Sequence, residues 1–350
     1  MSNTTLIPGG PRSSGAIPQR RIPQLWPKDR RFRILSLDGG GICGVFPASV
    51  LAELEQRFCK GRRVSEYFDL IAGTSTGGIL ALGLGAGLSA AEMRNLYVKR
   101  GCEIFPKPKW RWLQKLSILR QYALYKYDRA AISGILAEVL GQKLFGESLN
   151  RLCIPAFDGT HGEIFVYKTP HHPDYKFDRH EKMVNIGLAT SAAPSFFAPF
   201  KNGPYHLVDG GVWANNPIML AVIEALICFD IEPTQIDVLS IGCSDDPYLV
   251  SPRQISWGGL IFWKDVIYAA MRLQSLAATN QARLLLGPHA VVRLNPQPYS
   301  PPIDLDDWQR AVDLLPSDAA TTVAANADRI GSIFFGEPAE HFIPVPLPDR

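Results

Sequence analysis

The stretch DLIAGTSTGGILAL, residues Asp69–Leu82, constrains the fold of this chain more than any other. An apolar run ends in the pentapeptide G-T-S-T-G, and an apolar helical pattern follows at once. This order fits the nucleophile elbow, a tight turn between a strand and a helix that exposes a serine hydroxyl, here that of Ser75. Gly73 and Gly77 would let strand and helix pass close together, and the first N–H groups of the helix would face the hydroxyl. Because G-x-S-x-G also arises by chance, a plain glycine-containing turn stays open on this pattern alone.

A second glycine loop follows the strand-like run RFRILSL. The sequence LSLDGGGICG places Gly39, Gly40 and Gly41 directly after Asp38 and before a helical pattern. Consecutive glycines allow neighbouring main-chain N–H groups to converge on one anionic oxygen, as an oxyanion hole or as a phosphate cradle. The loop matches neither the P-loop nor the G-x-G-x-x-G pattern. Nucleotide binding by this loop is therefore the weaker hypothesis, and a tight turn without a ligand stays open.

A third loop, YHLVDGGVWANNP, places Asp209 at the end of a strand and before two glycines. A carboxylate that closes an apolar strand needs a partner, because burying it alone is costly. A serine hydroxyl would be a suitable partner. Asn216 and Pro217, in the same motif, are good first residues for a helix, so we expect a structural role for them.

Strand-like and helix-like segments alternate along most of the chain. After RFRILSL and YFDLIAG, further strands are expected at EIFVYKT, HLVDGG, IDVLSIG and VVRLN. A helix that ends near Cys59 carries Val50, Leu51, Leu54 and Phe58 on one face, as a core-facing helix does. The alternation predicts an α/β fold in which helices cover both faces of a mainly parallel sheet. In such sheets the reactive loops lie beyond the carboxyl ends of the strands, where these glycine loops fall.

Composition narrows the function classes. The formal net charge of +3 over 350 residues gives no sign of DNA or RNA binding. A bilayer span needs about 20 apolar residues, and the longest nearly unbroken apolar run, Ile79–Leu88, is much shorter. The six cysteines are scattered without a C-x-x-C pair or a histidine at zinc-ligand spacing. This pattern favours a reduced, cytoplasmic protein without a metal site.

Taken in this order, the three loops resemble those of the patatin-like phospholipases, and ATSAAPSFFAPF resembles the family's segment before the D-G-G strand. The resemblance covers about residues 31–295. It implies a patatin-like three-layer α/β/α fold with a serine nucleophile elbow, membrane phospholipid esters as substrate, and a Ser–Asp dyad of Ser75 as nucleophile and Asp209 as base. The implied oxyanion hole draws its N–H donors from Gly39, Gly40, Gly41 and Thr76. The family's loop usually reads D-G-G-G-x-R/K-G, and Cys43 stands where the basic residue is expected, so this loop offers no basic side chain for a charge contact to a substrate phosphate.

The expected organisation has three parts. Residues 1–30 are rich in Pro, Gly and Ser, and seven basic residues against one acid lie between Pro11 and Arg33, so a flexible basic arm is expected there. A patatin-like domain is expected over residues 31–300. A C-terminal helical segment, residues 301–350, is expected to pack on it.

Bacterial proteins of this family that resemble the chain include effectors of cyclic-oligonucleotide antiphage (CBASS) systems, in which a cyclic dinucleotide such as cGAMP activates the phospholipase against the cell's own membrane. The resemblance thus implies a cyclic dinucleotide activator, no cofactor for the chemistry, and action on the inner membrane from the cytoplasm. In the polar segment TPHHPDYKFD, side chains that could contact the phosphates are His171, His172, Lys176 and Arg179. A solvated loop is the simpler interpretation of that segment, and the oligomeric state is left open.

Two aromatic stretches suit a membrane surface. PKPKWRWLQKL, residues Pro106–Leu116, interleaves basic residues with tryptophans, as binding to an anionic membrane favours. An amphipathic helix with its tryptophans in the core would have the same pattern. ISWGGLIFW, residues Ile255–Trp263, is expected to fill the core or to flank an acyl channel.

Three alternatives are left open. An unregulated lipid acyl hydrolase would carry the same motifs. A Ser–Asp–His triad would need His289 or His341, which alone follow Asp209 as the α/β-hydrolase order requires, while His206 would point to the opposite face of its strand. An inert module could use the glycine loops as an anion cradle, although the serine and the aspartate both stand in the expected loops.

Overall fold

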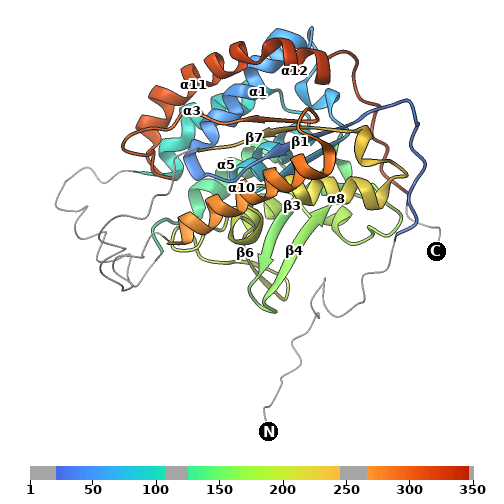
Figure 1. The fold of residues 1–350 in the computed structure, drawn as a ribbon. Coiled ribbons are helices and arrows are strands. Elements are labelled where there is room, and N and C mark those ends of the chain that lie inside the picture. Colours follow the sequence, from blue (N-terminus) through green and yellow to red (C-terminus); the bar gives the residue numbers. More distant parts are fainter. Residues whose placement is uncertain (1–20, 107–124, 245–265, 347–350) are drawn as a thin grey trace, which may run out of the picture.

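The computed structural model describes residues 21–106, 125–244 and 266–346 (Figure 1). Three expected features lie wholly or largely outside them: the first part of the basic arm, the basic and aromatic stretch from Lys107 onward, and ISWGGLIFW. Within the described residues, no helix combines the length and the apolar character that a membrane span needs.

One mixed sheet of eight strands organises the described residues. Its strands are β1 Phe32–Leu37, β2 Leu70–Gly73, β3 Arg151–Asp158, β4 Glu163–Lys168, β5 Phe200–Asn202, β6 Tyr205–Asp209, β7 Ile236–Ile241 and β8 Val291–Leu294. Their order is β5-β6-β3-β2-β1-β7-β8, and β4 also pairs with β3. From β3 to β8 the neighbouring strands run parallel, while β3–β4, β3–β6 and β5–β6 are antiparallel. The predicted α/β fold with a mainly parallel centre is confirmed.

The sequence patterns do not predict two of the strands, β3 and β5. The run RLCIPAFD of β3 contains Pro155, which cannot donate to a ladder and argues against a central strand. Here β3 pairs with β2 only before this proline. β5 has three residues, too few for a periodic signal.

Helices cover both faces of the sheet, as Figure 1 shows. The helices are α1 Val45–Phe58, α2 Thr76–Gly85, α3 Ala90–Ile104, α5 Ala130–Leu140, α6 Met183–Thr190, α7 Gly211–Ala214, α8 Ile218–Cys228, α10 Val266–Leu286, α11 Trp308–Ala325 and α12 Ala327–Phe334, and the 3-10 turns are η1 Gly41–Gly44, η2 Val64–Tyr67, η3 Phe145–Glu147, η4 Asp178–His180 and η5 Pro233–Gln235. Side chains of β1 alternate between two cores. Leu35 and Leu37 face the larger core, with α1, α2, α3, α5, α6, α11 and α12, while Phe32 and Ile34 face a smaller one with α8 and α10.

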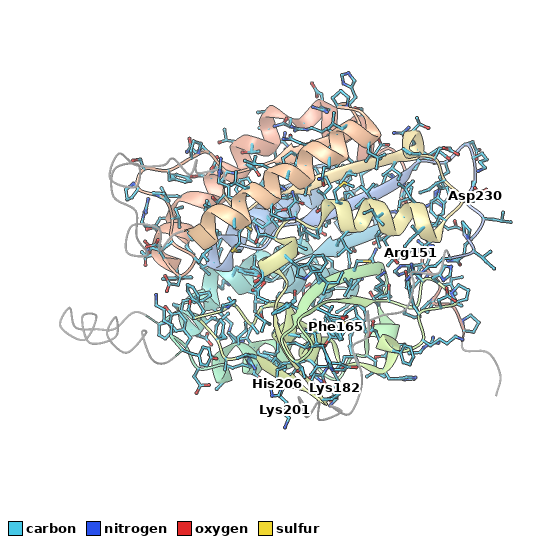
Figure 2. The ribbon with its side chains drawn as sticks, turned by 60° about the horizontal axis from the view of Figure 1, so that its bottom comes forward. Arg151, Phe165, Lys182, Lys201, His206 and Asp230 are labelled. Atoms are coloured by element: carbon cyan, nitrogen blue, oxygen red, sulfur yellow. The ribbon has the colours of Figure 1, made fainter. Side chains whose placement is uncertain are left out.

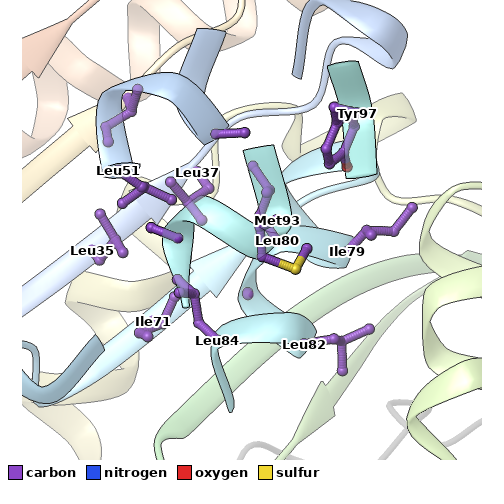
Figure 3. Packing of buried hydrophobic residues seen from close by; sticks show 14 of the residues in the cluster. Leu35, Leu37, Leu51, Ile71, Ile79, Leu80, Leu82, Leu84, Met93 and Tyr97 are labelled. Carbon is purple, nitrogen blue, oxygen red and sulfur yellow. The ribbon is translucent and has the colours of Figure 1, made fainter. Parts of the chain in front are cut away.

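The helix α2 lies inside the larger core. All ten of its residues, TGGILALGLG, are buried, and a helix that is apolar all round is expected to be surrounded by protein. Figure 3 shows Leu80 and Leu84 of α2 packed with Leu35 of β1, Ile71 of β2 and Met93 of α3. The helix that follows the serine elbow is therefore enclosed by the core along its whole length.

Residues 21–30 correct the expected flexible arm. Trp26 is buried, with its ring 4.7 Å from that of Phe32 and 5.4 Å from that of Phe229. The N–H of Gln24 donates to the carbonyl of Cys228 at 2.8 Å. Burial of a large aromatic ring offsets the entropy of ordering this polar segment. The packed part of the chain thus begins before residue 31.

The C-terminal helix α11 lies along α1, far from it in sequence (Figure 1), and α12 meets the end of α1 at Phe58. Phe334 is fully buried, and the ring of Phe335 stacks on that of Phe58 at 5.2 Å. These apolar contacts hold the C-terminal segment on the larger core.

Candidate active site

The turn from β2 to α2 places Ser75 at the carboxyl edge of the sheet. Ser75 has φ 53° and ψ −119°, a conformation that is strained for a residue with a side chain. A Cβ on Gly73 would collide with the carbonyl of Gly77, and one on Gly77 would collide with the carbonyl of Leu37. Both glycines are thus required by close backbone approach, as the sequence motif predicts.

The register of the sheet carries Asp209 to the same place. Ala72 of β2 is level with Cys153 of β3. β2 ends one residue later, at Gly73, where the chain turns into the elbow. Farther along β3, Ala156 pairs with Asp209, the last residue of the antiparallel strand β6. The last residue of β6 therefore lies beside the serine elbow.

Ser75 and Asp209 are in direct contact. The hydroxyl Oγ of Ser75 donates to Oδ2 of Asp209 at 2.6 Å, and Asp209 Oδ1 accepts from the N–H of Gly211 at 2.7 Å. Burial raises the pKa of Asp209 to about 6, although the two hydrogen bonds act in the opposite direction. At neutral pH this carboxylate is largely ionised, yet it is a stronger base than an exposed aspartate.

Thr190 holds the elbow in place through two hydrogen bonds. No site residue is predicted in its segment from the sequence. Its hydroxyl accepts from the N–H of Ser75 at 3.0 Å and donates to the carbonyl of Pro155 at 2.7 Å. The elbow is thereby tied to β3. Thr190 lies in ATSAAPSFFAPF, so the resemblance of that segment was the signal that could have found it.

The glycine loop after β1 borders the serine. A Cβ on Gly39 would lie 3.3 Å from Cβ of Ser75. In the described part of the chain, the N–H groups of Gly40 and Gly41 make no hydrogen bond, whereas the N–H of Gly39 donates to the carbonyl of Asn215 at 2.9 Å. The expected role of Gly39 as an oxyanion donor is therefore corrected, because its donor is already occupied.

Thr76 follows Ser75 as the first residue of α2 and offers a main-chain N–H next to the serine. Its hydroxyl donates to the phenol oxygen of Tyr97 at 2.6 Å, and that phenol donates to the carbonyl of Thr76 at 3.0 Å. Its N–H, in the first turn of α2, makes no hydrogen bond with any described residue. The site thus combines a hydroxyl on a carboxylate with free N–H groups, the geometry of acyl transfer.

Comparison with known proteins decides the family. A family model described as patatin-like phospholipase matches residues 35–222, more than half of the chain. The chain belongs to the patatin-like phospholipase family. It is therefore a serine acyl hydrolase.

Several relatives cover about two thirds of the chain. A cGAMP-activated phospholipase from Escherichia coli is 35% identical over 244 residues, which are 65% of this chain and 67% of that protein. A cGAMP-activated phospholipase from Vibrio cholerae is 35% identical over 240 residues, 64% of this chain and 67% of that protein. Patatin-like protein 2 from Oryza sativa subsp. indica is 32% identical over 253 residues, 63% of this chain and 62% of that protein.

Cys43, where the family has a basic residue, is buried against the C-terminal region. Its thiol faces the carbonyl of Ile303 at 3.8 Å. A cation reaches the glycine loop from β8 instead: Arg293 donates to both carboxylate oxygens of Asp38, at 2.8 and 2.6 Å, and to the hydroxyl of Ser240 at 2.7 Å. Arg293 is thus occupied in holding the first residue of the loop.

The histidines do not complete a triad in this patatin-like fold. All seven lie in the described residues, and none hydrogen-bonds to Ser75 or Asp209. His289 is exposed just before the first residue of β8, at the amino edge of the parallel strands. His341 lies with Asp69 around a cavity of about 330 Å³ at that same edge. His206 lies with Lys201 at the outer margin of β5 and β6 (Figure 2).

The segment TPHHPDYKFD is not the solvated loop that the sequence suggests. His171 and His172 are buried. Nε2 of His171 lies 3.1 Å from Glu224 Oε1, and Nε2 of His172 lies 3.1 Å from the carbonyl of Ile22. These two imidazoles are therefore not presented to an outside phosphate. Of the four residues considered, Lys176 is exposed, and Arg179 donates to the carbonyl of Val345 at 3.1 Å.

One buried group in the described residues has the composition of a metal site. The ligand atoms of Cys153, His171 and Glu224 lie within 4.8 Å of one another. Glu224 is already neutralised by Lys168, whose Nζ lies 2.6 Å from Oε2, and it also accepts from Tyr175. Burial keeps the pKa of the Cys153 thiol well above its usual value. The group is therefore a satisfied hydrogen-bonded network between the sheet and α8.

Proposed function

We propose that this chain hydrolyses ester bonds of membrane phospholipids with Ser75 as nucleophile and Asp209 as general base, and that a cyclic dinucleotide activates it. The observation that carries the chemistry is the 2.6 Å hydrogen bond from the Ser75 hydroxyl to a buried carboxylate, beside unoccupied main-chain donors. Membership of the patatin-like phospholipases supports the lipid ester as substrate.

The reaction has two steps. Ser75 Oγ attacks the ester carbonyl while Asp209 takes the hydroxyl proton, and the N–H groups of Gly40, Gly41 and Thr76 stabilise the oxyanion. The ester C–O bond breaks, the lysophospholipid oxygen takes the proton from Asp209, and water then hydrolyses the acyl-enzyme. An aspartate is a weak base for a serine hydroxyl, so the oxyanion hole supplies much of the rate. Each lost donor typically costs about 2.7–4 kcal/mol.

The proposed regulation rests on the names of two relatives, which are cGAMP-activated phospholipases. By analogy, cGAMP or a related cyclic dinucleotide would switch on the hydrolase in the cytoplasm, and the enzyme would act peripherally on the inner membrane as an antiviral effector. An unregulated lipid acyl hydrolase is the alternative. It would have the same dyad and the same oxyanion donors.

Hydrolysis of defined vesicles tests both parts. Phosphatidylethanolamine and phosphatidylglycerol vesicles are incubated with the wild type and with Ser75→Ala, each with and without a panel of cyclic dinucleotides, and released fatty acid is measured. The expected result is release by the wild type that rises with one nucleotide, and none by Ser75→Ala. Equal release with and without every nucleotide would reject the activation and keep the hydrolase. Full release by Ser75→Ala would reject the nucleophile.

A further inference from the structure

Two neighbouring asparagines, Asn215 and Asn216, follow the D-G-G motif. Only one of the two side chains has hydrogen-bond partners for both its oxygen and its nitrogen among the described residues. The side chain of Asn216 is fully bonded: Oδ1 accepts from the N–H of Ile218 at 3.0 Å, and Nδ2 donates to Thr279 Oγ1 at 3.0 Å. The side chain of Asn215 donates through Nδ2 to Ser275 Oγ of α10 at 3.1 Å. Its Oδ1 is buried, with no hydrogen-bond partner among the described residues. A buried carbonyl oxygen without a partner is costly, so this one calls for an explanation.

The unpartnered oxygen lies near the reacting groups, separated from each of them by the position of one glycine. A Cβ on Gly39 would lie 2.7 Å from Asn215 Oδ1 and 3.3 Å from Cβ of Ser75. A Cβ on Gly211 would lie 3.3 Å from Asn215 Oδ1 and 3.0 Å from Asp209 Oδ1. Two glycines thus let this amide oxygen come close to both members of the dyad.

We propose that Asn215 Oδ1 holds the water that hydrolyses the acyl-enzyme. The inference rests on the proposed Ser75–Asp209 function and concerns its second step. Once Ser75 Oγ is acylated it no longer donates to Asp209, so Oδ2 of the carboxylate is free for another donor. A water that donates one O–H to Asp209 and the other to Asn215 Oδ1 has both protons engaged. Its lone pair can then be directed at the acyl carbonyl.

The step balances without a further reactant. The water oxygen bonds to the acyl carbon and gives one proton to Asp209, the bond from the carbonyl carbon to Ser75 Oγ breaks, and Oγ recovers that proton as the fatty acid leaves. Asn215 stays neutral and only accepts a hydrogen bond. Its loss would therefore slow deacylation and spare acylation.

Burst kinetics with a p-nitrophenyl ester of a medium-chain fatty acid separate the two steps. Assays include the activating nucleotide if the wild type requires it. For Asn215→Ala we expect the rate of the p-nitrophenol burst to stay within about threefold of the wild-type acylation rate. Steady-state turnover should be lower by about tenfold, as for one lost hydrogen bond. Mass spectrometry of the intact protein should then show an accumulated acyl adduct. Ser275→Ala is the matched control, since it removes the partner of Nδ2 and leaves Oδ1. Ser275→Ala should show the same ratio of burst rate to steady-state rate as the wild type.

A second variant separates the lost acceptor from lost structure. Asn215→Asp keeps an acceptor oxygen, and its negative charge would raise the pKa of Asp209. Its deacylation should recover at alkaline pH, where Asn215→Ala stays slow. Three results for Asn215→Ala would overturn the proposal. The burst and the steady-state rate could be slowed equally, or the burst alone could be slowed, as the loss of an oxyanion donor would cause. The third result is no change in either rate. Turnover by Ser75→Ala would instead overturn the dyad, so the two failures are distinguishable.

Discussion

Arg293 of β8 and Asp38, the first residue of the glycine loop, form a two-pronged ion pair with N–O distances of 2.8 and 2.6 Å. Both side chains are nearly buried, at 10% and 3% exposure. Burial raises the pKa of Asp38 even against the charge of Arg293. The pair therefore anchors the loop whose N–H groups are proposed to form the oxyanion hole.

Removing this cation should destabilise the fold strongly. We expect Arg293→Met to lower the free energy of unfolding by about 3–5 kcal/mol, because it leaves a buried carboxylate without its partner. Chemical denaturation measures the loss. Arg62→Met is the control, since Arg62 pairs with Glu66 on the surface at 3.1 Å and such pairs contribute about 0–1 kcal/mol. Equal losses for the two variants would contradict the anchoring role.

The pH dependence of hydrolysis should report Asp209. The base must be ionised to accept the serine proton, and its pKa is raised to about 6. We expect kcat/KM to be level at neutral pH and to fall about tenfold per pH unit below that pKa. Initial rates in a series of buffers test this, with intrinsic fluorescence as the check that the chain stays folded. A level profile through that range would rule out Asp209 as the titrating base.

The same shift predicts that the dyad costs stability. The folded-state pKa of Asp209 lies above the ordinary value of 3.8, so the folded chain binds the proton more tightly than the unfolded chain. The stability that the protonated carboxyl contributes is therefore fully present at acid pH and is lost as pH rises through about 6. Asp209→Asn removes the buried charge and can still bond Ser75 and Gly211. At neutral pH this variant should be more stable by about 2–3 kcal/mol, with the gain vanishing at acid pH. A gain that is independent of pH would contradict this reading.

Gly40 should tolerate no side chain. A Cβ there would collide with Cβ of Cys243, so Gly40→Ala must displace the loop and its donor. We expect a loss of at least about 100-fold in kcat/KM, as for a missing oxyanion donor. Gly134→Ala is the matched control, because it is exposed in α5 with nothing within 4 Å of the added Cβ. That variant should keep full activity and gain up to about 1 kcal/mol of stability.

The serine elbow could be read from the sequence because its constraints are local. Gly73, Gly77 and the strained Ser75 are needed for one turn between a strand and a helix, and all lie within five positions. Asp209 could be read for a related reason, since a carboxylate that closes an apolar strand needs a partner. Their 2.6 Å contact joins two such local signals.

The rest of the site depends on pairings that no local pattern specifies. The bond from Thr190 to the elbow, and the bond that occupies the N–H of Gly39, both join segments more than 100 positions apart. The burial of His171 follows from Glu224 on α8, which sequence alone does not bring to it. The polarity of TPHHPDYKFD therefore predicts solvent exposure, while the tertiary fold supplies buried partners instead.

Labelling by a fluorophosphonate tests the pairing of Ser75 with Asp209 most directly. The wild type and Asp209→Asn are exposed to the probe, again with nucleotide if it is required, and the adduct is mapped by peptide mass spectrometry. We predict one adduct, on Ser75, and a labelling rate at least about 100-fold lower in Asp209→Asn, as for loss of a general base. An adduct on another residue, or labelling of Asp209→Asn at the wild-type rate, would contradict the account.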